Sequence, residues 1–304
     1  MPSMGASHDA VDAYALERYS AKMSSNTTGI AVRPMVRSLG AEVGPVDLRD
    51  LDRNAFELIR GAFLAHSVLV FRHQDLDPDS QIALAKRFGE IYLYDRGILP
   101  RFGHTDRPEL ADKAELAIIN NSGRTKEVMT DGSRRKPTEF WHADSTWVEC
   151  PPAHSFLAVK ELPEVGGDTL FASQFAAFDA LSDGLQRLLS SLRAVHQSPA
   201  YLLSRCGEWA HPVIVTHPEN GRKLLYLNPL SVRRFEGMTE AESAGLLQFL
   251  FAHQTQPEFV YRHRWEPGDV VMWDNRCLQH YAVDDYADAP RVLVRVSVQG
   301  APPV

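Results

Sequence analysis

The chain has 304 residues, of which 44% are hydrophobic, 23% charged and 9% aromatic, as in an average folded globular protein. Domains usually span about 100–200 residues, so this length allows one large domain or two small ones. The 39 acidic side chains exceed the 32 basic ones and give a net charge of −7, which argues against a nucleic-acid partner and against a polybasic membrane-binding surface.

The sequence also shows no membrane span, no signal peptide and no disulfide pattern. No apolar run approaches the roughly 20 residues of a bilayer span, and the first 30 residues lack the apolar core of a signal peptide. The cysteines, Cys150, Cys206 and Cys277, are odd in number and far apart, which fits a reduced protein better than a disulfide scaffold. We therefore expect a soluble cytoplasmic enzyme or binding protein.

The N-terminal half is predicted to combine a few strands and helices with one long loop. Residues 1–29 show no sustained apolar period, so we expect a disordered tail before a single domain over 30–304. Short strands are predicted at 30–35, 39–48 and 67–72, and amphipathic helices at 54–66 and 77–88. Residues 92–139 are mostly Gly, Pro, Arg, Asp and Asn around one strand-like segment at 114–121, which indicates a lid loop.

The C-terminal half alternates short apolar segments with Gly and Pro turns. Strands are predicted at 154–162, 168–173, 211–218, 223–229, 259–265, 269–275, 280–286 and 291–298, and helices at 174–193 and 240–253. Many short strands with few helices favour a mainly β protein with flanking helices, of the sandwich or jelly-roll type, over a parallel doubly wound sheet.

The segment FWHADSTW at 140–147 carries the strongest local signal for chemistry. His142 and Asp144 are two residues apart, so on a strand their side chains leave the same face. His280, which follows a turn and a strand, would complete a set of two histidines and one carboxylate that suits Fe(II). Spacing alone leaves the alternative open, since an H-x-D pair is common in strands and a lone histidine is more often a hydrogen-bonded core residue.

Two arginines stand out in the last predicted strand. Arg291 and Arg295 are four apart in RVLVRV, so both point to one side of the strand. Burying two guanidinium groups is costly unless they meet anions, and arginine matches a carboxylate or sulfonate well. The two arginines therefore either bind buried anions or lie on the exposed face of an edge strand. Thr169, in the turn GGDT, could donate its hydroxyl to the same anion.

The segments WHADSTWVECPPAHSFLAVKELPEVGGDTLFAS and FVYRHRWEPGDVVMWDNRCLQHYAVDDY, with RVLVR after them, resemble the TauD/TfdA family of Fe(II)- and 2-oxoglutarate-dependent dioxygenases. The resemblance runs from about Ile30 to Gly300 and implies a double-stranded β-helix, a cupin-like jelly roll. It implies that His142, Asp144 and His280 bind Fe(II), and that Arg291 and Thr169 hold the remote carboxylate of 2-oxoglutarate. Arg295 matches the arginine that binds the anionic group of the substrate.

The resemblance implies hydroxylation of a small organic anion by O2, with release of succinate and CO2. The stretch before the first ligand is long, as in the aryloxyacetate enzymes, and Tyr92 and Tyr94 stand where taurine dioxygenase has a histidine. We therefore expect an aryloxyalkanoate, with C–O cleavage, ahead of a taurine-like alkylsulfonate. Tyr92, Tyr94 and Trp147 are candidates for the wall of the substrate pocket, although each could equally be a packing residue.

The sequence leaves other functions open. Asp144 occupies the position that is small in related halogenases, so hydroxylation is expected. A non-catalytic jelly-roll protein that binds a small acid and a zinc hydrolase with the same three ligands are the alternatives from other classes. The oligomeric state also stays open, although homo-oligomers are common in the family.

Overall fold

The computed structural model describes residues 29–94, 110, 113–120, 128–130, 133–135, 140–198 and 207–304. The predicted disordered tail, apart from Gly29, and most of the predicted lid loop lie outside these ranges. No helix within the described ranges has the length and apolar character needed to cross a membrane.

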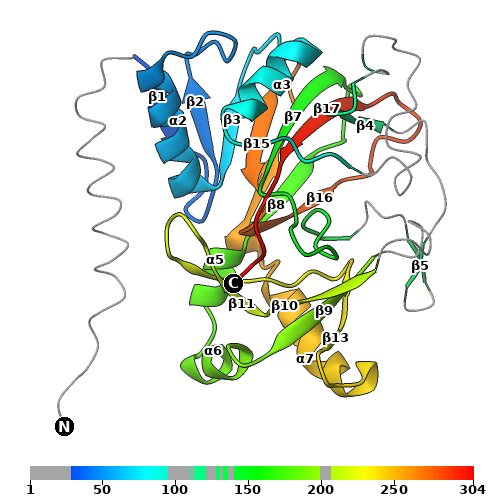
Figure 1. The fold of residues 1–304 in the computed structure, drawn as a ribbon. Coiled ribbons are helices and arrows are strands. Elements are labelled where there is room, and N and C mark those ends of the chain that lie inside the picture. The colour runs from blue at the N-terminus through cyan, green and yellow to red at the C-terminus, as the bar shows by residue number, and fades with distance from the viewer. Residues whose placement is uncertain are drawn as a thin grey trace.

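A seven-stranded sheet forms the larger β layer (Figure 1). Its neighbouring strands are antiparallel, except that the second pairs in parallel with the third. In spatial order the strands are β1 (Ala31–Pro34), β2 (Ala41–Gly44), β3 (Val68–Phe71), β15 (Val270–Asp274), β7 (His154–Glu161), β17 (Val292–Val298) and β4 (Ala117–Asn120).

A three-stranded antiparallel sheet packs against this layer. It consists of β14 (Val260–His263), β8 (Thr169–Ser173) and β16 (Leu278–Ala282). Phe171 and Leu278 from the small sheet share one apolar core with Val70, Leu157 and Trp273 from the large sheet. Two largely antiparallel sheets around a common core form the predicted jelly roll, so the mainly β fold class is confirmed.

Alternate residues of the central strands face different cores, because successive side chains of a strand leave opposite faces. On β17, Val294, Val296 and Val298 belong to the core on the outer face, whereas Leu293 belongs to the core between the sheets. Arg295 is two residues after Leu293 on the same strand, so its side chain also points into the space between the two sheets.

Two helices cover the outer face of the large sheet (Figure 1). α2 (Arg53–His66) begins where the Asp52 carboxylate accepts the Ala55 N–H, and α3 (Pro78–Lys86) begins after a similar cap at Asp77. Gln81 of α3 is fully buried and donates to backbone oxygens of Phe156 and Val294, which joins the helix to β7 and β17. The two predicted N-terminal helices are therefore confirmed within a few residues.

A further helical and β segment lies beyond the small sheet. Its elements are α5 (Gln174–Asp179), α6 (Asp183–Leu189), β9 (Arg193–Gln197), β10 (Glu208–Pro212), β11 (Ile214–Thr216), β12 (Lys223–Leu225), β13 (Val232–Phe235), α7 (Glu240–His253) and the short helix η3 (Pro257–Phe259). β5 (Val128–Thr130) and β6 (Ser133–Arg135) pair with each other as an antiparallel hairpin.

The helix predicted over 174–193 is wrong in one respect. It is two helices, because the chain turns at Ala180 and Ser182 then caps α6 by accepting the Leu185 N–H. β9 begins at Arg193, where the single helix was expected to end. In contrast, α7 spans the predicted residues, and Thr239 with Glu242 forms a capping box at its start.

Candidate metal centre and cosubstrate site

The structure brings His142, Asp144 and His280 together. One nitrogen or oxygen atom from each lies within 4.8 Å of the others. The backbones of His142 and His280 form an isolated bridge, in which each N–H donates to the other's carbonyl at 3.0 and 2.7 Å. Asp144 begins a turn, so the prediction that the H-x-D pair lies on one strand is wrong. The turn, rather than strand alternation, directs the carboxylate toward the two imidazoles.

Both imidazoles are in the form that binds metals. Nδ1 of His142 lies 2.8 Å from the Phe140 carbonyl, which only accepts hydrogen bonds. Nδ1 therefore carries the proton, and the lone pair is left on Nε2. Burial lowers the pKa of His142 and lowers that of His280 to about 3, so both rings are neutral at pH 7.

Asp144 is held at both its side chain and its backbone. Burial, the largest single influence, would raise the pKa of its carboxyl, but the charge and hydrogen bond of Arg295 act together with His280 and His142 to keep the pKa below its usual value. Arg295 Nη1 donates to Asp144 Oδ2 at 2.7 Å. The Asn275 side chain accepts the Asp144 N–H at 2.8 Å and donates to its carbonyl at 3.1 Å and to that of Pro152 at 2.9 Å.

Asn275 was not a predicted site residue. It follows β15, more than a hundred residues from Asp144, and no spacing rule connects the two. Taken together, the donor set consists of two neutral imidazoles and one ionised carboxylate. This set fits a borderline divalent cation such as Fe(II), and the assignment of these residues as metal ligands stays a prediction.

Both predicted arginines are buried, Arg291 at 3% and Arg295 at 5% exposure, which excludes the exposed edge-strand alternative. Arg291 immediately precedes β17, and its Nε donates to the Gly167 carbonyl at 2.9 Å. Its Nη2 lies 3.4 Å from Thr169 Oγ1. Arg291 and Thr169 are therefore neighbours, and their assignment to the cosubstrate stays a prediction. Burial lowers the pKa of Arg291.

Gly167 is a second residue that sequence reasoning did not single out. Its φ of +75° lies in the left-handed region, and a Cβ there would meet Cδ and Nε of Arg291 at 3.0 Å. Only glycine therefore lets the guanidinium approach this turn without strain. The paired glycines of the segment GGDT are the sequence signal that could have identified it.

Two of the three predicted aromatic wall residues lie beside Arg295. Its guanidinium carbon is 4.9 Å from the centre of the Tyr94 ring, and Tyr92 packs edge-on against Tyr94 at 4.9 Å. The Tyr94 hydroxyl lies 3.0 Å from Ser297 Oγ. Trp147 is half-buried and ends the turn that begins at Asp144; across the described residues its ring makes no aromatic or cation–π contact with this group.

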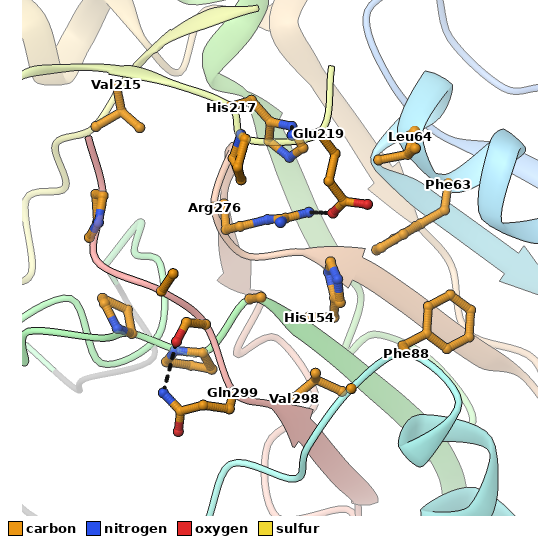
Figure 2. Close-up of a pocket in the computed structure, with 18 of the residues that line it drawn as sticks. Phe63, Leu64, Phe88, His154, Val215, His217, Glu219, Arg276, Val298 and Gln299 are labelled. Atoms are coloured by element: carbon orange, nitrogen blue, oxygen red, sulfur yellow. Dashed lines mark hydrogen bonds and ion pairs between the residues drawn. The ribbon is translucent and has the colours of Figure 1, made fainter. Parts of the chain in front are cut away.

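A cavity among the described residues lies away from this group. It has a volume of about 610 Å³, and none of the predicted site residues lines it (Figure 2). Apolar walls from Phe63, Phe88 and Val298 face a charged side where Arg276 donates to Glu219 at 2.7 Å.

The charged groups around Arg276, on one side of this cavity, are paired with one another. Asp274 accepts hydrogen bonds from Arg276 and lies 3.0 Å from His217 Nε2, while the N–H groups of residues 219 and 220 donate to His217 Nδ1. His217, Asp274 and Cys277 are also close enough to share an ion. However, the lone pairs of His217 and Asp274 are used within the protein, and burial raises the pKa of the Cys277 thiol well above its usual value. We therefore assign this cluster a structural role.

Comparison with known proteins places the chain in a family. Residues 31–297 match the model of the taurine catabolism dioxygenase TauD, TfdA family. The chain is 35% identical over 294 residues to an alpha-ketoglutarate-dependent sulfate ester dioxygenase of Pseudomonas putida, covering 90% of each chain. It is 36% identical over 270 residues to the alpha-ketoglutarate-dependent 2,4-dichlorophenoxyacetate dioxygenase of Cupriavidus pinatubonensis, covering 83% of this chain and 91% of that one.

The fold is also similar to that of a solved dioxygenase structure. The crystal structure of a putative alpha-ketoglutarate-dependent taurine dioxygenase from Burkholderia xenovorans superimposes with a TM-score of 0.78 at 32% identity, covering 91% of this chain and 94% of that one. The chain therefore belongs to the TauD, TfdA family and is an alpha-ketoglutarate (2-oxoglutarate)-dependent dioxygenase.

Proposed function

We propose that this enzyme hydroxylates a small organic anion at a ferrous centre held by His142, Asp144 and His280. The observation that carries the proposal is the convergence of two neutral imidazoles and an ionised carboxylate beside two buried arginines. When bound, Fe(II) supplies the redox chemistry that activates O2, and the protein supplies binding and orientation. The reaction balances as one oxygen atom entering the substrate C–H bond and the other entering succinate, with CO2 lost from 2-oxoglutarate.

The remote carboxylate of 2-oxoglutarate is assigned to Arg291 and Thr169. Arg291 is buried and its Nε is fixed on the Gly167 carbonyl, so the guanidinium is held in one orientation before the cosubstrate arrives. A preorganised guanidinium binds a carboxylate strongly because little side-chain freedom is lost on binding.

The anionic group of the substrate is assigned to Arg295. Its Nη1 is engaged by Asp144, but its buried Nε has no hydrogen-bond partner among the described residues. A buried donor without a partner is costly, and an anion would relieve that cost. The sulfate ester and the dichlorophenoxyacetate in the names of the two relatives each carry one anionic head group, which supports this assignment.

Tyr92, Tyr94 and Trp147 are proposed to contact the body of the substrate. The edge-on pair of tyrosines beside Arg295 offers an aromatic surface, which favours an aryloxyalkanoate over an alkylsulfonate. Hydroxylation at a carbon that carries the ether oxygen would give a hemiacetal, whose collapse cleaves the C–O bond.

Oxygen uptake and succinate release test the proposed function. Ferrous enzyme with 2-oxoglutarate should consume O2 faster when an aryloxyalkanoate or alkylsulfonate is added, and Arg295→Ala should lose most of this stimulation. Asp144→Ala should abolish substrate-coupled succinate formation, whereas Asp79→Ala, at an exposed site on α3, should not. Equal stimulation by neutral esters would contradict the anion assignment, and turnover without O2 would indicate a hydrolase instead.

A further inference from the structure

Thr169 accepts hydrogen bonds from two side chains. It is the first residue of β8 and pairs with His263 of β14. Trp265, two residues beyond His263, donates its indole N–H to Thr169 Oγ1 at 3.0 Å. Arg291 Nη2 lies 3.4 Å from the same oxygen. Thr169 is 4% exposed, so solvent has little access to compete for these bonds.

These contacts fix the direction in which the Thr169 hydroxyl proton points. A threonine hydroxyl has one proton and two lone pairs, and indole and guanidinium N–H groups can only donate. Trp265 and Arg291 therefore occupy both lone pairs, and the proton of Thr169 is left for a third group. Within the described ranges of the chain, no group accepts that proton.

The indole ring of Trp265 is itself held in place. It packs edge-on against His263, with ring centres 4.5 Å apart. His263 Nδ1 lies 3.0 Å from the Tyr261 hydroxyl, and its Nε2 lies 3.1 Å from Asp269 Oδ2. His263 and Asp269 are fully enclosed by the fold, so the ring that orients Trp265 has little freedom to move.

We infer that Trp265 is a positioning residue that turns the Thr169 hydroxyl into a hydrogen-bond donor toward the remote carboxylate of 2-oxoglutarate. This inference rests on the proposed function, because it assigns that carboxylate to Arg291 and Thr169. Without the indole N–H, one lone pair of Thr169 is open and the hydroxyl can rotate to other partners. The cosubstrate then loses part of an oriented hydrogen bond, while the metal centre is unchanged.

Cosubstrate binding to Trp265→Phe tests the inference. Ferrous enzyme is titrated anaerobically with 2-oxoglutarate, and the visible charge-transfer band of the metal chelate gives the dissociation constant. We expect binding about fivefold to tenfold weaker than in the wild type, the size of one hydrogen bond of about 1 kcal/mol. Trp209→Phe, at an exposed tryptophan of β10, is the matched control and should bind like the wild type.

A second ligand separates positioning from a general structural effect. 2-Oxobutyrate keeps the metal-chelating oxo acid but lacks the remote carboxylate, so Trp265→Phe should bind it as the wild type does. An equal loss for both oxo acids would overturn the inference, as would unchanged binding of 2-oxoglutarate. A wild-type enzyme that gives no band with either acid would instead contradict the proposed function.

A double-mutant cycle identifies the residue through which Trp265 acts. Thr169→Val removes the hydroxyl, so adding Trp265→Phe to it should weaken binding no further. Additive losses in the double variant would overturn the inference. If Trp265→Phe folds poorly, Trp265→Leu, which also lacks the indole N–H, replaces it in the comparison of 2-oxoglutarate with 2-oxobutyrate.

Discussion

Replacing Asn275 by alanine should weaken metal binding without touching a proposed ligand. The Asn275 side chain is 1% exposed and makes three hydrogen bonds, two of them to the backbone of Asp144. At about 1 kcal/mol per bond, the variant should lose about 3 kcal/mol of unfolding free energy. The turn that aims the Asp144 carboxylate would also lose its support. Changes of this kind next to metal ligands commonly cost 10–100-fold in affinity.

Gln74 provides a matched control for the loss of stability. Its side chain also makes three hydrogen bonds to backbone groups, accepting from the Leu48 N–H and donating to the carbonyls of Val46 and Arg72. It lies between β3 and α3, away from the candidate metal centre. Gln74→Ala should therefore lower the unfolding free energy by a similar amount and leave metal affinity unchanged.

The assay pairs urea unfolding with calorimetric titration of Mn(II) or Fe(II) under anaerobic conditions. We expect Asn275→Ala to be destabilised and to bind the metal about 10–100-fold more weakly. If both variants lose stability equally and both keep wild-type metal affinity, Asn275 does not position Asp144 for metal binding. If Gln74→Ala loses metal affinity as well, the weaker metal binding of Asn275→Ala results from lower overall stability and not from a change in the turn at Asp144.

Two further predictions concern the cosubstrate site and acid stability. Gly167→Ala should raise the KM for 2-oxoglutarate about tenfold or more, because the added methyl group displaces Arg291. Gly221 is the control: its φ of +73° is similar, but no atom lies within 4 Å of an added Cβ. Gly221→Ala should therefore leave this KM unchanged. Burial lowers the pKa of His211 to about 4, from an ordinary value of 6.5. The unfolded chain therefore binds the proton more readily, so His211 contributes stability above pH 6.5 that is lost as the pH falls toward 4, about 3 kcal/mol in total. Urea unfolding of His211→Gln between pH 7 and 4 should show a smaller acid loss than the wild type, and an identical loss would contradict the assignment.

The repeating patterns of the sequence predicted most of the fold. Alternating apolar residues identified the strands of both sheets, and the cap at Thr239 agrees with the predicted start of α7. The break between α5 and α6 was missed, because the residues around Ser182 suit a helix interior or a cap, and only packing decides between them.

From the sequence alone, the resemblance to a known family implied that two histidines, an aspartate and two arginines form the site, and these roles stay predictions. The charge, orientation and supporting contacts of these groups could be read only from the packed sheets. Arg295 and Asn275 are 151 and 131 residues from Asp144, and Trp265 is 96 residues from Thr169. Such contacts arise when two sheets close on each other, and chain periodicity carries no information about them. Burial, which sets the neutral state of the histidines, likewise exists only once the sheets are packed.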